Sequence, residues 1–409
     1  MVAGGDHDKH KGKVLIREYE AERDLAGAEE VDRSCEVGTS GGAVSLFTDL
    51  LGDPVCRVRH SPAFIMLSMM KLAETAGPEK EIVGLIRGCV KTVTCGKKTP
   101  RSAGASVPVY TKAAYILGLR VSPSHRRMGI GVKLVEKMED WFRSQGAEYA
   151  YVATDKENEA SLRLFTGRCG YSKFRTPSIL VQPVFAHYQP LSRSAAVVRI
   201  PPEEAETLYR RRFSTTEFFP RDIDAVLRNR LSLGTFLALP AGSRWAGVHR
   251  FLSNPPDSWA VVSVWDSMSI FHLEVRGASL LRRGLAWTSR AVDRALPWLR
   301  IPSFPDLFRP FGGYFLYGLG GEGPAAAKLL RVLCGHAHNM ALAGSCCVVA
   351  TEVAAGEPLI PGIPHWRRLS CSEDLWCIKR LAEDYSDGSV GDWTHSPPAS
   401  SIFVDPREV

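Results

Sequence analysis

Apolar side chains recur at steps of three and four along residues 129–145, which predicts one long amphipathic helix. Gly146 follows directly and suits the left-handed position at which many helices end. Apolar runs on either side predict strands at residues 110–121 and 149–154 and a second helix at residues 158–166. The apolar positions of the long helix are Ile130, Leu134, Val135, Met138, Trp141 and Phe142.

The rest of the first half predicts an α/β fold with a mixed sheet. The elements follow the order β-α-α-β-β-β-α-β-α-β-β, and a Lys/Ser/Gly/Pro-rich stretch without periodicity predicts a loop at residues 96–108. Besides the elements above, we expect strands at 14–19, 63–72 and 81–94, a pair of short strands within 171–184, and helices at 24–35 and 46–51.

Several short residue patterns of the first half, called landmarks here, occur again in the second half at similar spacing. A strand with an apolar-Gly pair leads through a loop and a helix to a glycine, and then to a strand that ends in an acidic residue. This repetition predicts a duplicated fold, although two unrelated βαβ-like units would share some of it. Strands are expected at 235–239, 247–252 and 259–265. The paired landmarks are Leu117-Gly118 with Tyr317-Gly318, Gly146 with Gly344, and Val152-Ala153-Thr154-Asp155 with Val349-Ala350-Thr351-Glu352.

Composition points to an ordinary globular protein, because 45% of the 409 residues are hydrophobic and 23% are charged. No apolar run reaches the roughly 18 residues of a membrane span, and the N-terminus lacks the apolar segment of a secretory signal. The ten cysteines are scattered, which indicates reduced thiols. We therefore expect a nuclear or cytoplasmic protein without a membrane partner.

The net charge of +7 fits either a nucleic acid or a phosphorylated cofactor as the partner. No run of five Lys or Arg occurs. Arg210-Arg211-Arg212 lies in a helix-like segment without interleaved aromatic residues, which favours a solvated helix face. We expect no direct binding of nucleic acid.

A basic, glycine-containing loop joins the strand at 110–121 to the long helix. Gly129 and Gly131 lack side chains, so backbone N–H groups there can approach an anion closely. The helix start adds unpaired donors and a positive dipole end, and Arg126 and Arg127 add formal charge. The pattern predicts a diphosphate site, and the alternative is a glycine-containing helix start with surface arginines.

This loop resembles the cofactor loop of the GNAT superfamily, Arg/Gln-x-x-Gly-x-Gly/Ala, at Arg126, Gly129 and Gly131. The resemblance implies acetyl-CoA as co-substrate, with a pantetheine arm paired to the preceding strand, and we expect no metal. Asn158 matches the residue that helps to close the site, and it also suits a helix N-cap. Many members have Tyr where this chain has Phe165, which leaves the catalytic acid unassigned. The implied cofactor-binding residues are Leu119, Arg120, Val121, Arg126, Arg127, Met128, Gly129, Ile130, Gly131, Asn158, Ser161 and Phe165.

Acetyl transfer to an amine requires a group that takes the amine proton. Asp155, at the end of the strand beside the cofactor, is the first candidate base, although it also suits a turn or a helix cap. Glu36 and His125 are further candidates that we expect to be solvated instead. Tyr171 and Tyr115 are candidate acids, and each also suits a packing role.

Four longer strings of residues carry a second resemblance, which runs from about Val14 to the end of the chain. They resemble the HOOKLESS family of plant N-acetyltransferases. That resemblance implies a role in hormone-dependent differential growth and a nuclear function in histone acetylation. The strings are Cys35-Glu36-Val37-Gly38, residues 45–54 (SLFTDLLGDP), residues 213–224 (FSTTEFFPRDID) and Phe403-Val404-Asp405-Pro406.

The second half lacks the cofactor loop. It has the loop Gly320-Gly321-Glu322-Gly323-Pro324, where Glu322 would repel a diphosphate and Pro324 has no N–H donor. We therefore expect a GNAT domain at residues 14–187, followed by a degenerate GNAT-like domain at 195–382. Residues 1–12 are expected to be disordered, and residues 383–409 to form an irregular tail.

Three functions remain open. The leading hypothesis is an acetyl-CoA-dependent N-acetyltransferase that acts on a protein amine, such as a histone lysine. The second is an acetyltransferase for small amines. The third is a weakly active or inactive GNAT scaffold that works through protein partners; the missing Tyr favours this hypothesis, and the intact cofactor loop opposes it.

Overall fold

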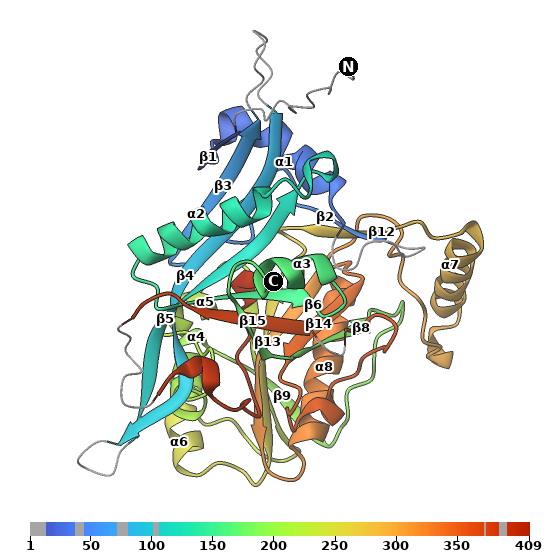
Figure 1. The fold of residues 1–409 in the computed structure, drawn as a ribbon. Coiled ribbons are helices and arrows are strands. Elements are labelled where there is room, and N and C mark those ends of the chain that lie inside the picture. Colours follow the sequence, from blue (N-terminus) through green and yellow to red (C-terminus); the bar gives the residue numbers. More distant parts are fainter. Residues whose placement is uncertain (1–13, 37–44, 72–80, 101–105, 372–373, 384–390) are drawn as a thin grey trace, which may run out of the picture.

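The computed structural model describes residues 14–36, 45–71, 81–100, 106–371, 374–383 and 391–409. Two mixed sheets form its framework (Figure 1). In spatial order, the first sheet contains β1 (Val14–Glu18), β3 (Ala63–Lys71), β4 (Glu81–Pro100), β5 (Ser106–Val121), β6 (Tyr149–Asp155), β15 (Asp374–Arg380) and β7 (Ser172–Arg175). The second contains β8 (Ser178–Pro183), β14 (Val348–Val353), β13 (Gly313–Glu322), β11 (Trp259–Asp266), β10 (Ser232–Pro240) and β9 (Ala195–Ile200).

The two sheets exchange strands. β15 follows the second sheet in the chain, yet it lies between β6 and β7 of the first sheet. β8 precedes most of the second sheet and pairs with its strand β14. Each sheet is thus completed by a strand from the other half of the chain. The domain boundaries at residues 187 and 195 stay a prediction.

The helices pack on both sheets. α2 (Ile130–Ser144) covers one face of the first sheet, close against β4, because a Cβ on Gly88 would lie only 2.5 Å from the sulfur of Met138. α8 (Ala326–Ala343) covers the outer face of the second sheet. The other helices are α1 (Ala21–Ser34), α3 (Glu159–Phe165), α4 (Pro202–Arg212), α5 (Ile223–Leu227), α6 (Val248–Ser253) and α7 (Leu280–Ala295).

An aromatic core fills the space between the two sheets. The rings of Tyr151 and Trp376 stack at 5.6 Å, and Phe218 meets Trp376 edge-on at 5.0 Å. Such pairs add to the stability that burial of their area provides. The two halves therefore share one hydrophobic core.

The duplication predicted from the landmarks is visible in the strands. β5 has a bulge at Gly118 (φ +62°), and β13 has one at Gly318 (φ +61°). Each bulged strand pairs in parallel with the strand that follows its helix. This register aligns Glu352 with Ala153, so the predicted match of Glu352 with Asp155 was wrong by two positions.

Three predicted elements were wrong, each because tertiary contacts override a local pattern. Residues 46–51 were predicted as a helix, but 46–49 lie in the strand β2 (Ser45–Asp49), which pairs with β12 (His272–Arg276). Residues 247–252 were predicted as a strand but form α6, whose Val248 and Phe251 are buried one turn apart. In the predicted loop at 96–108, the described residues 96–100 and 106–108 belong to β4 and β5, which pair with each other there.

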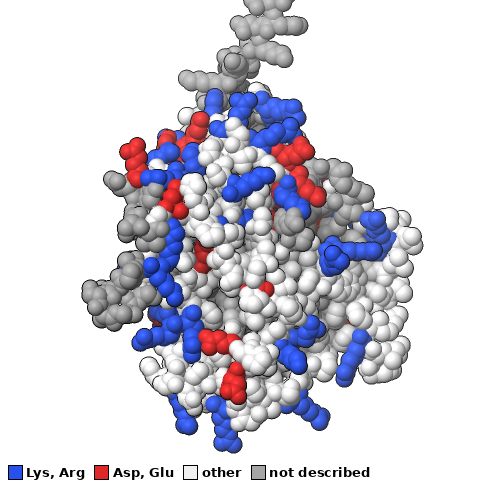
Figure 2. Space-filling view, turned by 60° about the horizontal axis from the view of Figure 1, so that its bottom comes forward, with Lys and Arg blue, Asp and Glu red and all other residues white. Residues whose placement is uncertain are grey.

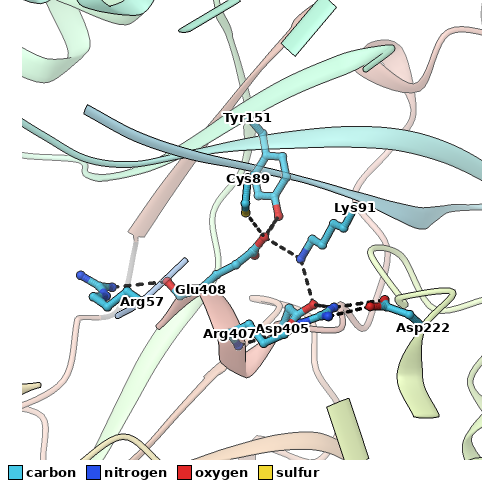
Figure 3. A network of polar contacts seen from close by, with 8 residues as sticks. All are labelled: Arg57, Cys89, Lys91, Tyr151, Asp222, Asp405, Arg407 and Glu408. Atoms are coloured by element: carbon cyan, nitrogen blue, oxygen red, sulfur yellow. Dashed lines mark hydrogen bonds and ion pairs between the residues drawn. The ribbon is translucent and has the colours of Figure 1, made fainter. Parts of the chain in front are cut away.

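The described part of the predicted irregular tail contains only two 3-10 turns, yet much of it is buried. Trp393 is fully buried, and residues 403–408 lie within the structure (Figure 3). Lys91 on β4 reaches Glu408 at 2.7 Å and Asp405 at 3.3 Å. The hydroxyl of Tyr151 donates to both carboxylate oxygens of Glu408 at 2.8 Å. The chain end is therefore part of the core.

Charge is spread over the surface. Figure 2 shows Lys and Arg side chains scattered over one face, interspersed with fewer Asp and Glu. Within the residues that the structure describes, no helix is both long and apolar enough to cross a bilayer. All ten cysteines are free thiols, as predicted.

Candidate functional site

The loop between β5 and α2 presents backbone donors to solvent. Arg127 (φ +63°) and Gly129 (φ +78°) both adopt left-handed backbone angles, and residues 126–129 are exposed. α2 begins after Gly129 without a side-chain cap and without an acidic residue in its first turn. A Cβ on Gly129 would meet no atom within 4 Å, so the space in front of it is open. An uncapped helix start of this kind is a ready site for an anion.

β5 and β6 diverge beside this loop. Their parallel pairing runs from Ala113 with Tyr149 to Ile116 with Val152 and then ends. Residues 117–121 of β5, which begin with the bulge, therefore have no ladder partner on the β6 side. This open edge contains Leu119 and Val121, the positions predicted to pair with an extended arm of a cofactor.

The helix α3 packs against the start of α2, beside this gap. Asn158 caps α3, since its side-chain oxygen accepts from the backbone N–H of Ser161 at 3.1 Å. Asn158 therefore has the N-cap role that was predicted as the alternative to cofactor binding. Leu164 lies 3.3 Å from where a Cβ on Gly131 would stand, so α3 packs directly on the first turn of α2. A larger residue at position 131 would push these helices apart.

The candidate residues Phe165 and Tyr171 lie together in the core. Phe165 is only 2% exposed, and its ring meets Tyr171 edge-on at 5.3 Å. Burial, and then the charge of Glu139, raise the pKa of Tyr171 well above its usual value. The Nζ of Lys379 lies 5.6 Å from the Tyr171 ring. Tyr171 therefore faces a buried ion pair of α2 and β15.

His125 was expected to be solvated, and that was wrong. It is 8% exposed, and its Nδ1 lies 2.9 Å from the hydroxyl of Ser124, because the 3-10 turn Pro123–His125 folds it under the loop. Glu36 is half-buried rather than solvated, and it accepts a hydrogen bond from Ser45 at 2.8 Å.

Three carboxyl groups gather where β6 and β14 end and β15 begins. Asp155, the predicted base, pairs with Asp374 across the β6–β15 ladder. Glu352 on β14 of the second sheet accepts from the indole N–H of Trp376 on β15 at 2.9 Å. Burial raises the pKa of Glu352 to about 8, and the charge of Asp374 adds to the rise. Burial also raises the pKa of Asp374 to about 6, with a contribution from Asp155.

The sequence did not single out Glu352 and Asp374 as site residues. Glu352 ended a landmark string and Asp374 precedes the apolar run of β15, but neither fact places them together. They meet because β15 is inserted into the first sheet, and no local pattern encodes that insertion.

Tyr115 on β5 lies near the carboxyl groups of Glu352 and Asp374, whose charges act on it. Its ring is 4.8 Å from that of Tyr151. Burial raises its pKa well above the usual value, and the charge of Glu408 adds to this. The charges of Glu352 and Asp374 raise it further, while that of Arg57 lowers it. The raised pKa keeps the Tyr115 hydroxyl protonated at neutral pH.

The corresponding loop of the second half is closed. Gly320, Gly321 and Glu322 lie in β13, although a loop was predicted, because they pair with β11. A Cβ on Gly323 would lie 1.9 Å from the carbonyl oxygen of Asp257. The N–H of Ala325, at the start of α8, donates to the hydroxyl of Ser258 at 3.1 Å. This helix start has little room or donor capacity left for an anion.

Comparison with known proteins agrees with this geometry. The sequence model of the acetyltransferase (GNAT) family matches residues 67–171, which include the loop. The chain is 62% identical to the "Probable N-acetyltransferase HLS1" of Arabidopsis thaliana over 97% of its own length and 100% of that protein.

Two solved structures share the fold over most of the chain. One is a GCN5-related glucosamine N-acetyltransferase region of a fungal multi-domain β-N-acetylglucosaminidase, with TM-score 0.53 and 12% identity over 90% of this chain and 38% of that one. The other is Saccharomyces cerevisiae N-myristoyltransferase with bound myristoyl-CoA, with TM-score 0.50 and 10% identity over 91% and 79% of the two chains. The predicted α/β GNAT fold is confirmed. The chain belongs to the HLS1 family and is an N-acetyltransferase of the GNAT type.

Proposed function

We propose that the enzyme binds acetyl-CoA with its diphosphate on the loop of residues 126–131 and its pantetheine arm along the open edge of β5. The observation that supports this most is the uncapped start of α2 behind a loop with two left-handed residues. Arg126 and Arg127 would pair with the diphosphate, and Asn158 would hold α3 over the arm. The role of Phe165 on that arm stays a prediction, since little of its ring is exposed.

The bound co-substrate supplies an acetyl thioester. The acceptor nitrogen bonds to the acetyl carbon as the carbon–sulfur bond breaks, so the amine must lose a proton and the leaving thiolate must gain one. We assign the first task to the carboxyl group of Glu352, whose pKa lies near working pH. Asp155, the first candidate from the sequence, is the alternative base. Tyr115 is the candidate donor, since its hydroxyl stays protonated; Tyr171 faces Glu139 and Lys379 instead.

The acceptor that we propose is a protein amine, such as a histone lysine in the nucleus, and the process is control of plant growth. The resemblance to the HOOKLESS family supports this. A small amine is the second candidate. A pure scaffold function is disfavoured, because the second half closes its loop and the first half leaves its loop open.

The pH dependence of turnover distinguishes Glu352 from Asp155. A base works in its deprotonated form, so with Glu352 as base kcat/KM rises with pH and levels off above about pH 8. Glu352→Gln should remove this limb and lower kcat about 100-fold or more, with acetyl-CoA affinity unchanged. Asp374→Asn, the matched control, should move the limb to lower pH, because it removes a charge that raises the pKa of Glu352. Full activity of Glu352→Gln with an unchanged limb would exclude this base.

The closed second loop predicts one acetyl-CoA per chain. Calorimetric titration of the full-length protein should give a stoichiometry of one, since the N–H of Ala325 at the start of α8 already donates to Ser258 at 3.1 Å and Arg212 is already paired with Glu322 at 3.2 Å. Two bound molecules per chain would show that the second half retains a cofactor site.

A further inference from the structure

A small cationic cavity lies beside the bulge of β5, on the side away from α2. It has a volume of about 20 Å³, enough for one water-sized group. Its lining includes three arginines, Arg57, Arg87 and Arg120, and one carboxylate, Asp32. Arg87 is satisfied, because it pairs with Asp32 at 2.5 Å and donates to the carbonyl of Gly118 at 3.3 Å. The lining therefore carries two positive charges in excess.

The other two arginines have few partners among the described residues. The Nε of Arg57 is buried without a hydrogen-bond acceptor. Arg57 donates through Nη2 to the backbone carbonyl of Glu408 at 3.3 Å, which places no negative charge on it (Figure 3). Within the described chain no side chain accepts a hydrogen bond from Arg120. Buried donors without acceptors are costly, and a guanidinium edge matches a carboxylate in shape and charge.

The second half offers an internal comparison for this cavity. The two bulges align Arg120 with Gly320 and Arg87 with Ser263. A Cβ on Gly320 would lie 2.1 Å from the ring of Phe213, so that aromatic side chain fills the space. Tyr209 completes the packing, with its hydroxyl 2.9 Å from that of Ser263. In the second half this position of the fold is filled by aromatic side chains, whereas in the first half it is a cavity lined by arginines.

The cavity is well placed relative to the proposed acceptor site. Leu117 and Gly118, which line it, follow Tyr115 on β5. Arg57, Glu352 and Asp374 all lie near enough to Tyr115 for their charges to act on its hydroxyl. A molecule with an amine and a carboxylate would meet charges of opposite sign at both ends.

We propose that this cavity receives one oxygen of an acceptor carboxylate, so that the enzyme prefers amines that carry a carboxylate a short distance away. The carboxylate can belong to a free amino acid or to an acidic residue beside a lysine in a protein. This inference rests on the proposed transferase function and adds the substrate class to it.

The test uses acceptors that differ only in the carboxylate. Initial rates at saturating acetyl-CoA would be measured for lysine against cadaverine, and for a Lys-Glu peptide against the same peptide with Lys-Gln. We expect kcat/KM to be at least tenfold higher for the acidic member of one pair, and which pair responds identifies the source of the carboxylate. A ratio near one in both pairs would overturn the proposal.

Two substitutions locate the effect. Arg57→Gln should bring the ratio toward one while acetyl-CoA affinity is retained. Arg59→Gln is the matched control, because Arg59 pairs with Asp53 at 2.6 Å outside the cavity and should keep the ratio. An unchanged ratio in folded Arg57→Gln protein would contradict the assignment. If Arg57→Gln does not fold, Arg120→Gln replaces it, judged by the same ratio.

Different results would contradict the proposed transferase function and the proposed carboxylate site. If no amine is acetylated although acetyl-CoA binds, the transferase proposal fails in its choice of acceptor. Calorimetric titration of lysine and of cadaverine into the protein loaded with acetyl-CoA then decides about the cavity. Binding of lysine alone would support the carboxylate site, and equal binding or none would reject it.

Discussion

Reversal of both loop arginines, Arg126→Glu with Arg127→Glu, should weaken acetyl-CoA binding at least about 100-fold. Each arginine is exposed beside the uncapped start of α2 and would contribute a charge-assisted contact to the diphosphate. Such contacts are worth about 1.5 kcal/mol each at the low end of their range, and 1.4 kcal/mol is tenfold in affinity. Reversal adds repulsion to the loss. Calorimetry or competition with a fluorescent CoA derivative measures the effect.

The control is Arg211→Glu, which changes an exposed arginine of α4 away from the loop. It alters the net charge in the same sense and should leave affinity within a factor of about two. An Arg126→Glu/Arg127→Glu protein that binds acetyl-CoA as the unmodified protein does would place the diphosphate elsewhere.

Replacement of Lys91 by Met should destabilise the folded protein by about 3–5 kcal/mol, because it leaves buried carboxylates without their cation. The Lys91 side chain is 2% exposed and pairs with both Glu408 and Asp405 (Figure 3). Arg407 still neutralises Asp405 at 2.7 Å, so the uncompensated charge falls mainly on Glu408. Urea unfolding followed by tryptophan fluorescence measures the loss.

The pH dependence of this loss has a definite sign. Burial already holds the pKa of Glu408 above its usual value, although Lys91 opposes this. Without Lys91 the pKa rises further, and a carboxyl group whose folded-state pKa is raised costs stability as pH rises past its unfolded pKa. The deficit should therefore be larger at pH 7 than at pH 5.

Two further variants check the origin of the loss. Adding Glu408→Gln to Lys91→Met should recover part of the stability, since it removes the uncompensated charge. Lys137→Met, on the exposed face of α2, should change stability by no more than about 0.5 kcal/mol. A Lys91→Met protein as stable as the unmodified one would mean that the network adds nothing to folding.

The structure of the proposed cofactor loop could be predicted because all of its parts are adjacent in the chain. Residues 119–131 contain the end of a strand, the basic turn, the glycines and the helix start, and each has a local signature. The short string Tyr317-Gly318 likewise indicated the repeated fold in the second half. For such features, local backbone preference and the final structure agree.

The group of Asp155, Glu352 and Asp374, where we propose that the acceptor reacts, could not be predicted, because its parts meet only through the exchange of strands. Glu352 and Asp374 lie on strands of different sheets, and nothing in the run of β15 distinguishes insertion beside β6 from pairing within the second sheet. The burial of residues 403–408 could not be predicted for a related reason. Asp405 and Glu408 look solvated in sequence, and they are buried because Lys91, more than 300 positions away, neutralises them.

The exchange of strands also constrains how the protein is made. Lys379 on β15 forms an ion pair of 2.7 Å with Glu139 on α2, and the two are 240 positions apart. A ribosome that adds 5–20 residues per second needs about 12–50 s to span that distance. During this time the edge of β6 that β15 will cover lacks its partner, and open strand edges pair readily with other chains. The nascent chain therefore carries an uncovered edge of β6 until its last strand has been made.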